Sequence, residues 1–240
     1  MKLLLSSILP TDDYDMETEV STATAMDNTN NLLDILKKNI KKRDRLVLVA
    51  NDPENTEKMD TKIDVIGTSF TLSGLPFKEV LAIDNRNYRN AKDIILNSDA
   101  IILCGGKCIR QMNFFNKMGL KDILKDYSGL TIGISAGSMN LGQTIANFPE
   151  ELSDMGGEKW IEGLGFHNSI IIPHFDGECG NYQFISPDGI NIAGDYILPM
   201  SHEKELIAIP NYSYILIDNA NYTYYGNAYK LINGEIIKIN

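Results

Sequence analysis

The stretch Thr131-Ile132-Gly133-Ile134-Ser135-Ala136-Gly137-Ser138 decides the fold class of this chain. An apolar, β-branched strand is expected to end at Ile134, and a helix is expected from Ala136 to about Ala146. Gly-x-Ser-x-Gly between a strand and a helix is typical of a nucleophile elbow, whose small residues allow a sharp turn. The alternative is a structural tight turn. We predict Ser135 as a nucleophile at the carboxyl edge of a buried sheet, beside the positive end of a helix.

The residues before this turn predict an α/β architecture. Strands are expected at Lys2–Ser6, Arg45–Ala50, Glu79–Asp84 and Ala100–Cys104, and helices at Thr29–Lys42, Glu54–Leu72, Ala91–Asn97, Cys108–Met118 and Leu120–Asp126. Strands that are apolar on both faces and alternate with helices favour a mainly parallel sheet covered on both sides.

After Gly163 the pattern changes to strands, most of which are joined by short turns. They are expected at Ser169–Phe175, Glu205–Ile209, Ser213–Asp218, Tyr222–Tyr225, Ala228–Ile232 and Glu235–Ile239. Asn233-Gly234 lies between the last two and predicts a C-terminal β-hairpin with a type I′ turn. Because no linker or repeat interrupts the pattern, we predict one domain over residues 1–240.

A serine nucleophile needs a base, and the chain has only three histidines. His174 ends an apolar strand. If that strand is parallel to Thr131–Ile134, both carboxyl ends share the edge at which α/β sheets build their sites. His167 precedes the strand and is expected at the opposite edge, and His202 is expected in a solvated loop. We therefore predict His174 as the base.

The acid that would hold the imidazole is not decided by spacing. The candidates near the predicted site are Glu150, Glu151, Asp154, Asp176 and Glu178.

A second glycine cluster, Cys104-Gly105-Gly106-Lys107, follows the strand Ala100–Cys104. It is either a simple strand-to-helix turn or a second source of backbone N–H groups for an oxyanion. The segment has neither the spacing nor the Lys-Ser/Thr pair of a phosphate-binding loop.

The charge balance excludes two kinds of partner. The 240 residues include 22 Lys and Arg against 32 Asp and Glu, a net charge of −10 with the histidines neutral. Binding to nucleic-acid phosphates or anionic membranes needs clustered cations, so neither partner is expected. Residues 128–240 hold 4 basic against 13 acidic residues, and no arginine follows Arg110.

Cysteine usage and the N-terminal residues predict a cytoplasmic protein without a metal or organic cofactor. Cys104, Cys108 and Cys179 form neither a disulfide framework nor a zinc-ligand spacing. The apolar run Leu3 to Leu9 is followed by the acidic segment Asp12 to Glu19, unlike a secretory signal. We expect Leu3 to Leu9 to form the first buried strand.

At these residues the chain resembles the peptidase E family of serine peptidases, whose founding activity is aspartyl dipeptidase. The similarity covers roughly residues 1–220. It rests on Gly105-Gly106 with Gln111 downstream, the elbow at Ser135, Thr144-Ile145, and Gly163-Leu164-Gly165 leading into Pro173-His174-Phe175. The resemblance implies a flavodoxin-like α/β/α sandwich similar to class I glutamine amidotransferases, with a serine in place of their cysteine.

Carried over to this sequence, the resemblance implies Ser135 as nucleophile, His174 as base and Glu150, fifteen residues after the serine, as acid. It implies an oxyanion hole and substrate contacts at Gly105, Gly106 and Lys107, with the Ala136 N–H as the other donor. The expected substrate is a small peptide, and a homodimer is an assembly that the sequence leaves open.

The chain departs from the family pattern at three places. The turn reads Gly105-Gly106-Lys107-Cys108, where the family often has Gly-Gly-Gly-Asn. The acid is Glu150 rather than Asp. A second acidic position proposed in the family falls on Asn211, which favours Glu150 as the acid.

Charge also bears on the substrate. The family enzyme recognises aspartate with an arginine downstream of its histidine, but only Lys204, Lys230 and Lys238 supply cations after His174 here. We predict that a strict preference for N-terminal aspartate is lost. We also predict that the acidic segment 128–240 attracts the free α-amino group of a peptide.

The sequence leaves three other functions open and excludes a fourth. One is an esterase of α/β-hydrolase type, with His202 as base and Asp188 or Asp195 as its partner. Another is a peptidase that cleaves an Asp–Arg polymer, as cyanophycinases do. The third is a degenerate member that binds a peptide or metabolite without turnover, which the departures at Lys107, Cys108 and Asn211 would allow. A glutaminase is rejected, because the elbow has no cysteine.

Overall fold

A seven-stranded sheet forms the centre of the computed structural model, which describes residues 1–15, 20–149, 156–178, 185–186 and 189–240. Its strand order is β13 (Asn221–Tyr225), β12 (Tyr214–Asp218), β1 (Lys2–Ser6), β7 (Leu130–Ile134), β6 (Ala100–Leu103), β4 (Arg45–Val49) and β5 (Glu79–Ile83). The five strands from β1 to β5 in this order run parallel, whereas β12 and β13 are antiparallel to their neighbours. The predicted mainly parallel sheet is therefore confirmed.

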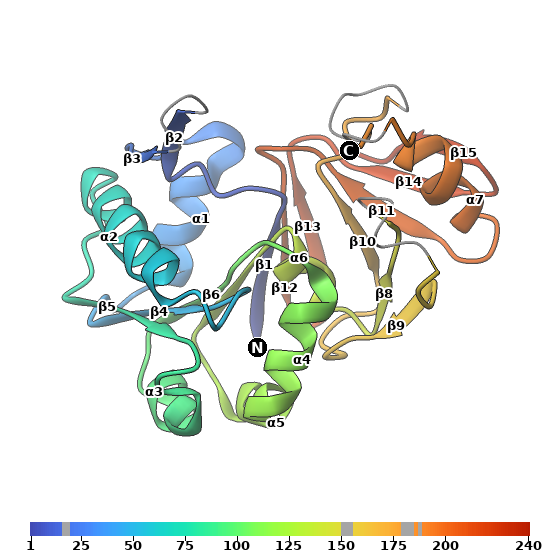
Figure 1. Cartoon of the computed structure of the whole chain (residues 1–240). Coiled ribbons are helices and arrows are strands. Elements are labelled where there is room, and N and C mark those ends of the chain that lie inside the picture. Colours follow the sequence, from blue (N-terminus) through green and yellow to red (C-terminus); the bar gives the residue numbers. More distant parts are fainter. Residues whose placement is uncertain (16–19, 150–155, 179–184, 187–188) are drawn as a thin grey trace.

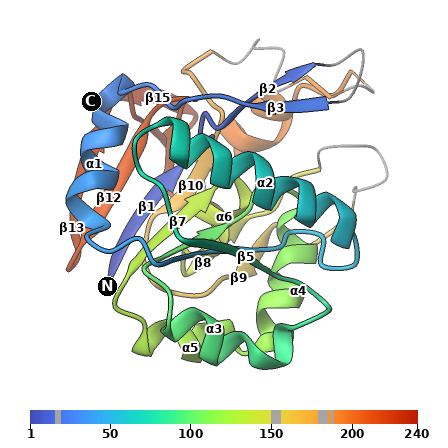
Figure 2. The ribbon, with the colours of Figure 1, turned by 90° about the vertical axis from the view of Figure 1, so that its left-hand side faces the viewer.

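Helices cover both faces of this sheet. They are α1 (Leu32–Asn39), α2 (Thr56–Leu72), α3 (Ala91–Leu96), α4 (Cys108–Met118) and α5 (Leu120–Asp126). Figures 1 and 2 show α1 and α2 on one face and α3, α4 and α5 on the other. Every residue of β6 is buried, which explains why this strand is apolar on both faces. Among the described residues, no helix is long and apolar enough to cross a membrane.

A second sheet stands beside the first, in the order β10 (Ile170–Pro173), β11 (Leu206–Ile209), β14 (Tyr229–Ile232) and β15 (Glu235–Lys238). The strands β10 and β11 are parallel, and the other pairs are antiparallel. Asn233 and Gly234 both have positive φ between β14 and β15. The strand that ends at His174 therefore belongs to a different sheet from the strand that ends at the elbow.

Side chains on one face of the second sheet pack against the core of the central sheet. Ile171, Ile207 and Ile209 pack into the large hydrophobic cluster of the central sheet. Their neighbours Ile172 and Ala208 pack instead into a smaller cluster on the other face of the second sheet. This is the pattern expected of strands whose successive side chains point to opposite faces.

The structure corrects three of the expected boundaries. The first strand is β1 (Lys2–Ser6), so these expected bounds are confirmed, whereas the longer strand expected from Leu3 to Leu9 is wrong. It ends at Ser6 because its pairing with both neighbours ends there, opposite Ile134 and Tyr214. The expected helix over Thr29–Lys42 is α1 only over Leu32–Asn39. It starts late because Asn30 and Asn31 adopt left-handed backbone conformations, and it ends early because the backbone of Ile40 is extended.

The third correction concerns the helix after the elbow. This helix, α6 (Ala136–Asn140), ends well before Ala146, because the chain enters the strand β8 (Thr144–Ala146). The β-branched pair Thr144-Ile145 suits that strand, which is antiparallel to β9 (Trp160–Glu162).

Several short elements were not predicted. They are the hairpin β2 (Asp12–Asp15) and β3 (Val20–Ala23), the single turns η1 (Thr29–Asn31) and η2 (Tyr88–Asn90), the π-helix η5 (Ala193–Ile197) and α7 (Leu198–Met200).

Candidate active site

Ser135 stands at a strained turn between β7 and α6. Its backbone has φ 50° and ψ −114°, a conformation that residues with a side chain rarely adopt. The turn is held because the Ser135 N–H donates to the Ser6 carbonyl at 2.8 Å. A Cβ on Gly133 would lie 2.7 Å from the Ser138 nitrogen, and a Cβ on Gly137 would overlap the Leu103 carbonyl. The glycines of the motif therefore permit close backbone approach on both sides of the serine.

His174 lies directly after β10 and faces this serine. Its Nε2 is 2.9 Å from Ser135 Oγ. The backbone is fixed independently of the ring, because the His174 N–H donates to Ser7 Oγ at 2.9 Å, and Ser7 Oγ donates to the Ile209 carbonyl at 2.6 Å. The structure thus brings together the two residues predicted as nucleophile and base, although they come from different sheets.

The other ring nitrogen contacts an amide rather than a carboxylate. His174 Nδ1 is 2.8 Å from Asn211 Oδ1, at the end of β11. An amide oxygen can only accept, so Nδ1 carries the proton and the lone pair of Nε2 faces Ser135. Asn211 departs from the acidic position of the family pattern, and its place shortly after the end of a strand is the sequence signal that could have assigned it to the site. Glu150, the predicted acid, lies outside the described residues.

Burial sets the protonation state of the proposed base. It lowers the pKa of His174 below the ordinary 6.5, and the hydrogen bond to Asn211 partly opposes that effect. Because Asn211 carries no charge, it stabilises an imidazolium only as a dipole. The ring is therefore neutral, and able to accept a proton, at pH 7.

The second glycine turn packs against the elbow. A Cβ on Gly105 would lie 3.2 Å from the Cβ of Ser135, and Gly106 has φ 146° beside Asn51. Lys107, the residue before α4, has an extended backbone, and Ala136 is the buried first residue of α6.

A network of buried side-chain amides is hydrogen-bonded to the backbone on both sides of this turn. Gln111 is fully buried, and its Nε2 donates to the Cys104 carbonyl just before the turn. Asn140 Nδ2 donates to Gln111 Oε1 at 2.8 Å and to the Cys108 carbonyl at 3.2 Å. This network gives Gln111, which the sequence motif included, a physical role.

The remaining histidines do not join Ser135. His167 is buried, with Nε2 3.4 Å from the Ser138 carbonyl, and burial lowers its pKa to about 4. His202 is exposed beside the turn of the β14–β15 hairpin, where a Cβ on Gly234 would lie 2.9 Å from its Nε2. Within the described part of the chain, no three His, Cys, Asp or Glu side chains gather as a metal-ligand set.

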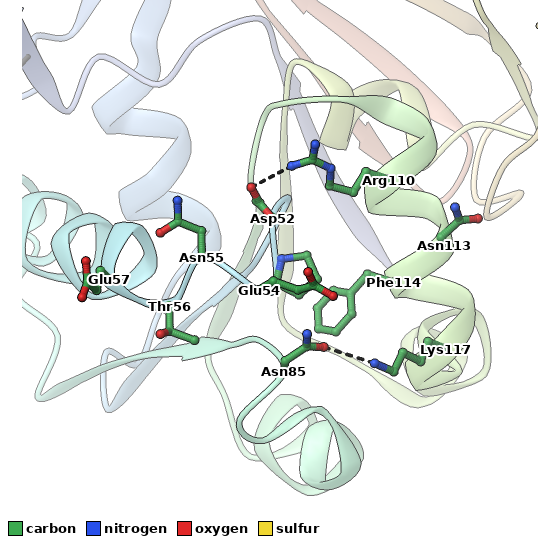
Figure 3. A pocket seen from close by; sticks show the side chains of 11 residues that line it. Asp52, Glu54, Asn55, Thr56, Glu57, Asn85, Arg110, Asn113, Phe114 and Lys117 are labelled. Atoms are coloured by element: carbon green, nitrogen blue, oxygen red, sulfur yellow. Dashed lines mark hydrogen bonds and ion pairs between the residues drawn. The ribbon is translucent and has the colours of Figure 1, made fainter.

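A large open cavity of about 860 Å³ lies beyond the ends of β4 and β5, away from Ser135 and His174 (Figure 3). Arg110 pairs with Asp52 at 2.7 Å, and Lys117 donates to Asn85 Oδ1 at 3.2 Å. Neither Ser135 nor His174 lines it.

Comparison with known proteins supports the expected relationship. Among solved structures, a candidate peptidase E from Listeria monocytogenes EGD-e is similar with a TM-score of 0.57 and 13% identity, over 93% of this chain and 96% of that chain. At this identity the likeness shows the fold alone. No curated protein matches. The sequence model of peptidase family S51 matches residues 20–224. Because this match covers most of the chain, the protein belongs to peptidase family S51, the peptidase E family, as the sequence motifs predicted.

Proposed function

We propose that this protein is a serine exopeptidase that hydrolyses small peptides through an acyl-enzyme on Ser135. The observation that carries the proposal is the 2.9 Å contact between His174 Nε2 and Ser135 Oγ at a strained elbow. Membership of a peptidase family supports the same class of reaction. A nucleophile and a base within hydrogen-bond reach, with the base oriented by a third group, are the signature of acyl transfer.

The proposed mechanism has two halves. His174 takes the proton from Ser135 as Oγ attacks the peptide carbonyl, and the imidazolium then gives that proton to the leaving amine. In the second half, His174 activates a water that hydrolyses the acyl-enzyme. Backbone N–H groups at Gly106–Lys107 and at Ala136 stabilise the oxyanion in both halves.

We propose Asn211, rather than Glu150, as the residue that orients the imidazole. The His174 Nδ1–H has one proton to donate, and Asn211 Oδ1 lies 2.8 Å away to accept it. The catalytic unit is then Ser135, His174 and Asn211, in which the third residue selects the tautomer without adding a charge.

We propose a substrate range that is not limited to N-terminal aspartate, since no arginine follows Arg110. The acidic segment 128–240 would attract the free α-amino group of a peptide. We also propose that the enzyme works in the cytoplasm as a flavodoxin-like α/β/α protein. A net charge of −10 supports the absence of nucleic-acid and membrane partners.

Labelling with a fluorophosphonate tests the proposal, because an activated serine attacks the phosphorus of this probe, displaces fluoride and becomes phosphonylated. The wild-type protein should be labelled, and Ser135→Ala and His174→Gln should each abolish labelling while circular dichroism stays unchanged. His202→Gln is the matched control and should label normally. Labelling that depends on His202 instead would favour the esterase, and a folded wild-type protein that stays unlabelled would favour a binding protein.

A further inference from the structure

A second cavity, of about 680 Å³, lies beside the proposed catalytic residues. Gly105 and Ile134, which line it, belong to the two turns that meet at Ser135. Tyr212, which follows Asn211, also lines it. Its volume lies within the range of about 300–1,000 Å³ that is usual for ligand sites. The cavity therefore has the size and place of a substrate pocket.

Two lysines on one side of α2 give this cavity its charge. Lys58 and Lys62 are one helical turn apart and both line it, against a single acidic residue, Asp12. Lys62 Nζ contacts Asn51 Oδ1 at 3.3 Å, and neither lysine forms an ion pair within the described residues. Like charges four residues apart repel each other on a helix, so an anion between them would relieve that repulsion.

The charge of Lys62 reaches the turn beside the serine. Burial raises the pKa of the Cys104 thiol, and the positive charge of Lys62 partly opposes that effect. Cys104 lines the same cavity and immediately precedes Gly105. In the cavity of Figure 3, by contrast, Arg110 already pairs with Asp52, and three acidic residues (Asp52, Glu54 and Glu57) line it against two cations. The cavity beside Ser135 is therefore the better anion site of the two.

The rest of the lining suits an amino-acid residue. Leu9, Val65 and Ile66 supply apolar surface, and Thr11 and Thr61 supply hydroxyl groups. A lysine ammonium is a compact point charge without the planar fork with which arginine holds one carboxylate geometry. Such a site should prefer a carboxylate without requiring the side chain of aspartate.

We infer that this cavity holds a carboxylate of the peptide substrate and that Lys62, with Lys58 at the exposed side, is the specificity determinant for it. The inference rests on the proposed peptidase function. The carboxylate is either the C-terminal group of a short peptide or the side chain of an acidic residue near the scissile bond. The two sources share one chemistry and are separated by the choice of peptide.

Binding to the Ser135→Ala protein tests the inference without turnover. Calorimetry would compare Ala-Ala-Ala with a free carboxyl end, the same peptide as its amide, and Ala-Glu-Ala as its amide. At least one carboxylate peptide should bind about tenfold or more tightly than the neutral amide, as expected for a hydrogen-bonded charge. Which of the two is preferred identifies the source of the carboxylate.

Substitutions in the same background identify the cation. Lys62→Met should remove the preference and Lys62→Arg should keep it, with folding verified by circular dichroism. Lys117→Met, in the cavity of Figure 3, is the matched control and should change nothing. Equal binding of the three peptides, no binding of any, or a preference that survives in the Lys58→Met/Lys62→Met double variant overturns the inference. Because turnover is not measured, failure of Ser135 labelling in the wild-type protein would refute the proposed function separately.

Discussion

Replacing Asn211 tests whether a neutral amide can serve as the third member of the proposed catalytic unit. In Asn211→Ala, the 2.8 Å hydrogen bond to His174 Nδ1 is lost, which costs about 1 kcal/mol, or roughly fivefold in rate. The ring then also populates the tautomer with its proton on Nε2, which cannot accept from Ser135. Because the His174 N–H stays bound to Ser7 Oγ at 2.9 Å, the base should remain near the serine. We expect kcat/KM to fall about 10- to 100-fold, less than the ~10⁴-fold loss that follows a fixed wrong tautomer.

Asn211→Asp changes the charge at the same place and gives the sign of the effect. His174 acts as a base only when it is neutral, so activity is lost as the pH falls through its pKa. Burial places that acid limb below pH 6.5 in the wild-type protein. A carboxylate would stabilise the imidazolium and move the limb to higher pH.

The assay for both variants is kcat/KM for a neutral dipeptide between pH 4.5 and 8.5, with fluorophosphonate labelling rates as a check. An Asn211→Ala protein within twofold of wild type would refute the orienting role. So would an Asn211→Asp protein whose acid limb stays in place or moves to lower pH.

Three further predictions concern the surroundings of the site. Burial lowers the pKa of His167 to about 4, so on acidification the unfolded chain binds a proton at this residue before the folded chain does. The neutral buried ring therefore costs no stability above pH 6.5, and stability is lost as the pH falls toward 4. Urea unfolding should show that wild-type stability drops by roughly 2–3 kcal/mol more than that of His167→Gln between pH 8 and 4.5, and parallel pH dependences would contradict this. Gly137→Ala should lower the free energy of unfolding by about 1–3 kcal/mol and slow labelling, because its Cβ overlaps the Leu103 carbonyl, and unchanged stability would exclude that overlap. Ser7→Ala should lower kcat about tenfold at constant KM by releasing the His174 N–H, whereas a change in KM alone would point to a role in binding.

Local signals predicted the central sheet well. The run Ala100–Cys104 is apolar at every position because β6 is buried on both faces, and burial of this kind leaves a strong trace in sequence. The elbow was equally readable, because Gly133 and Gly137 stand where backbone atoms approach too closely for a side chain. Here the sequence signal and the physical cause are the same.

The pairing of segments far apart in the chain was harder to predict from the sequence. No local sequence pattern shows that β10 pairs with β11 in a second sheet rather than with a strand of the central sheet, since strand pairing depends on residues far apart in the chain. The proposed role of Asn211 could not be predicted for a related reason. It depends on the contact with His174, and a comparison of charge alone treats an amide in place of a carboxylate as a loss. Glu150 lies outside the described residues, so its predicted role stays a prediction.

The proposed catalytic pair is divided between two sheets, so its activity should depend on how those sheets are joined. Ser135 follows β7, whereas His174 follows β10, and Ile171, Ile207 and Ile209 connect the second sheet to the large apolar cluster. Partial opening along this junction would separate base from nucleophile while the hydrogen bonds of the central strands stay closed. On heating, labelling of Ser135 should therefore decline before amide hydrogen exchange accelerates in β6 and β7. Mutations that loosen the junction would then inactivate the enzyme at temperatures at which most of the chain is still folded.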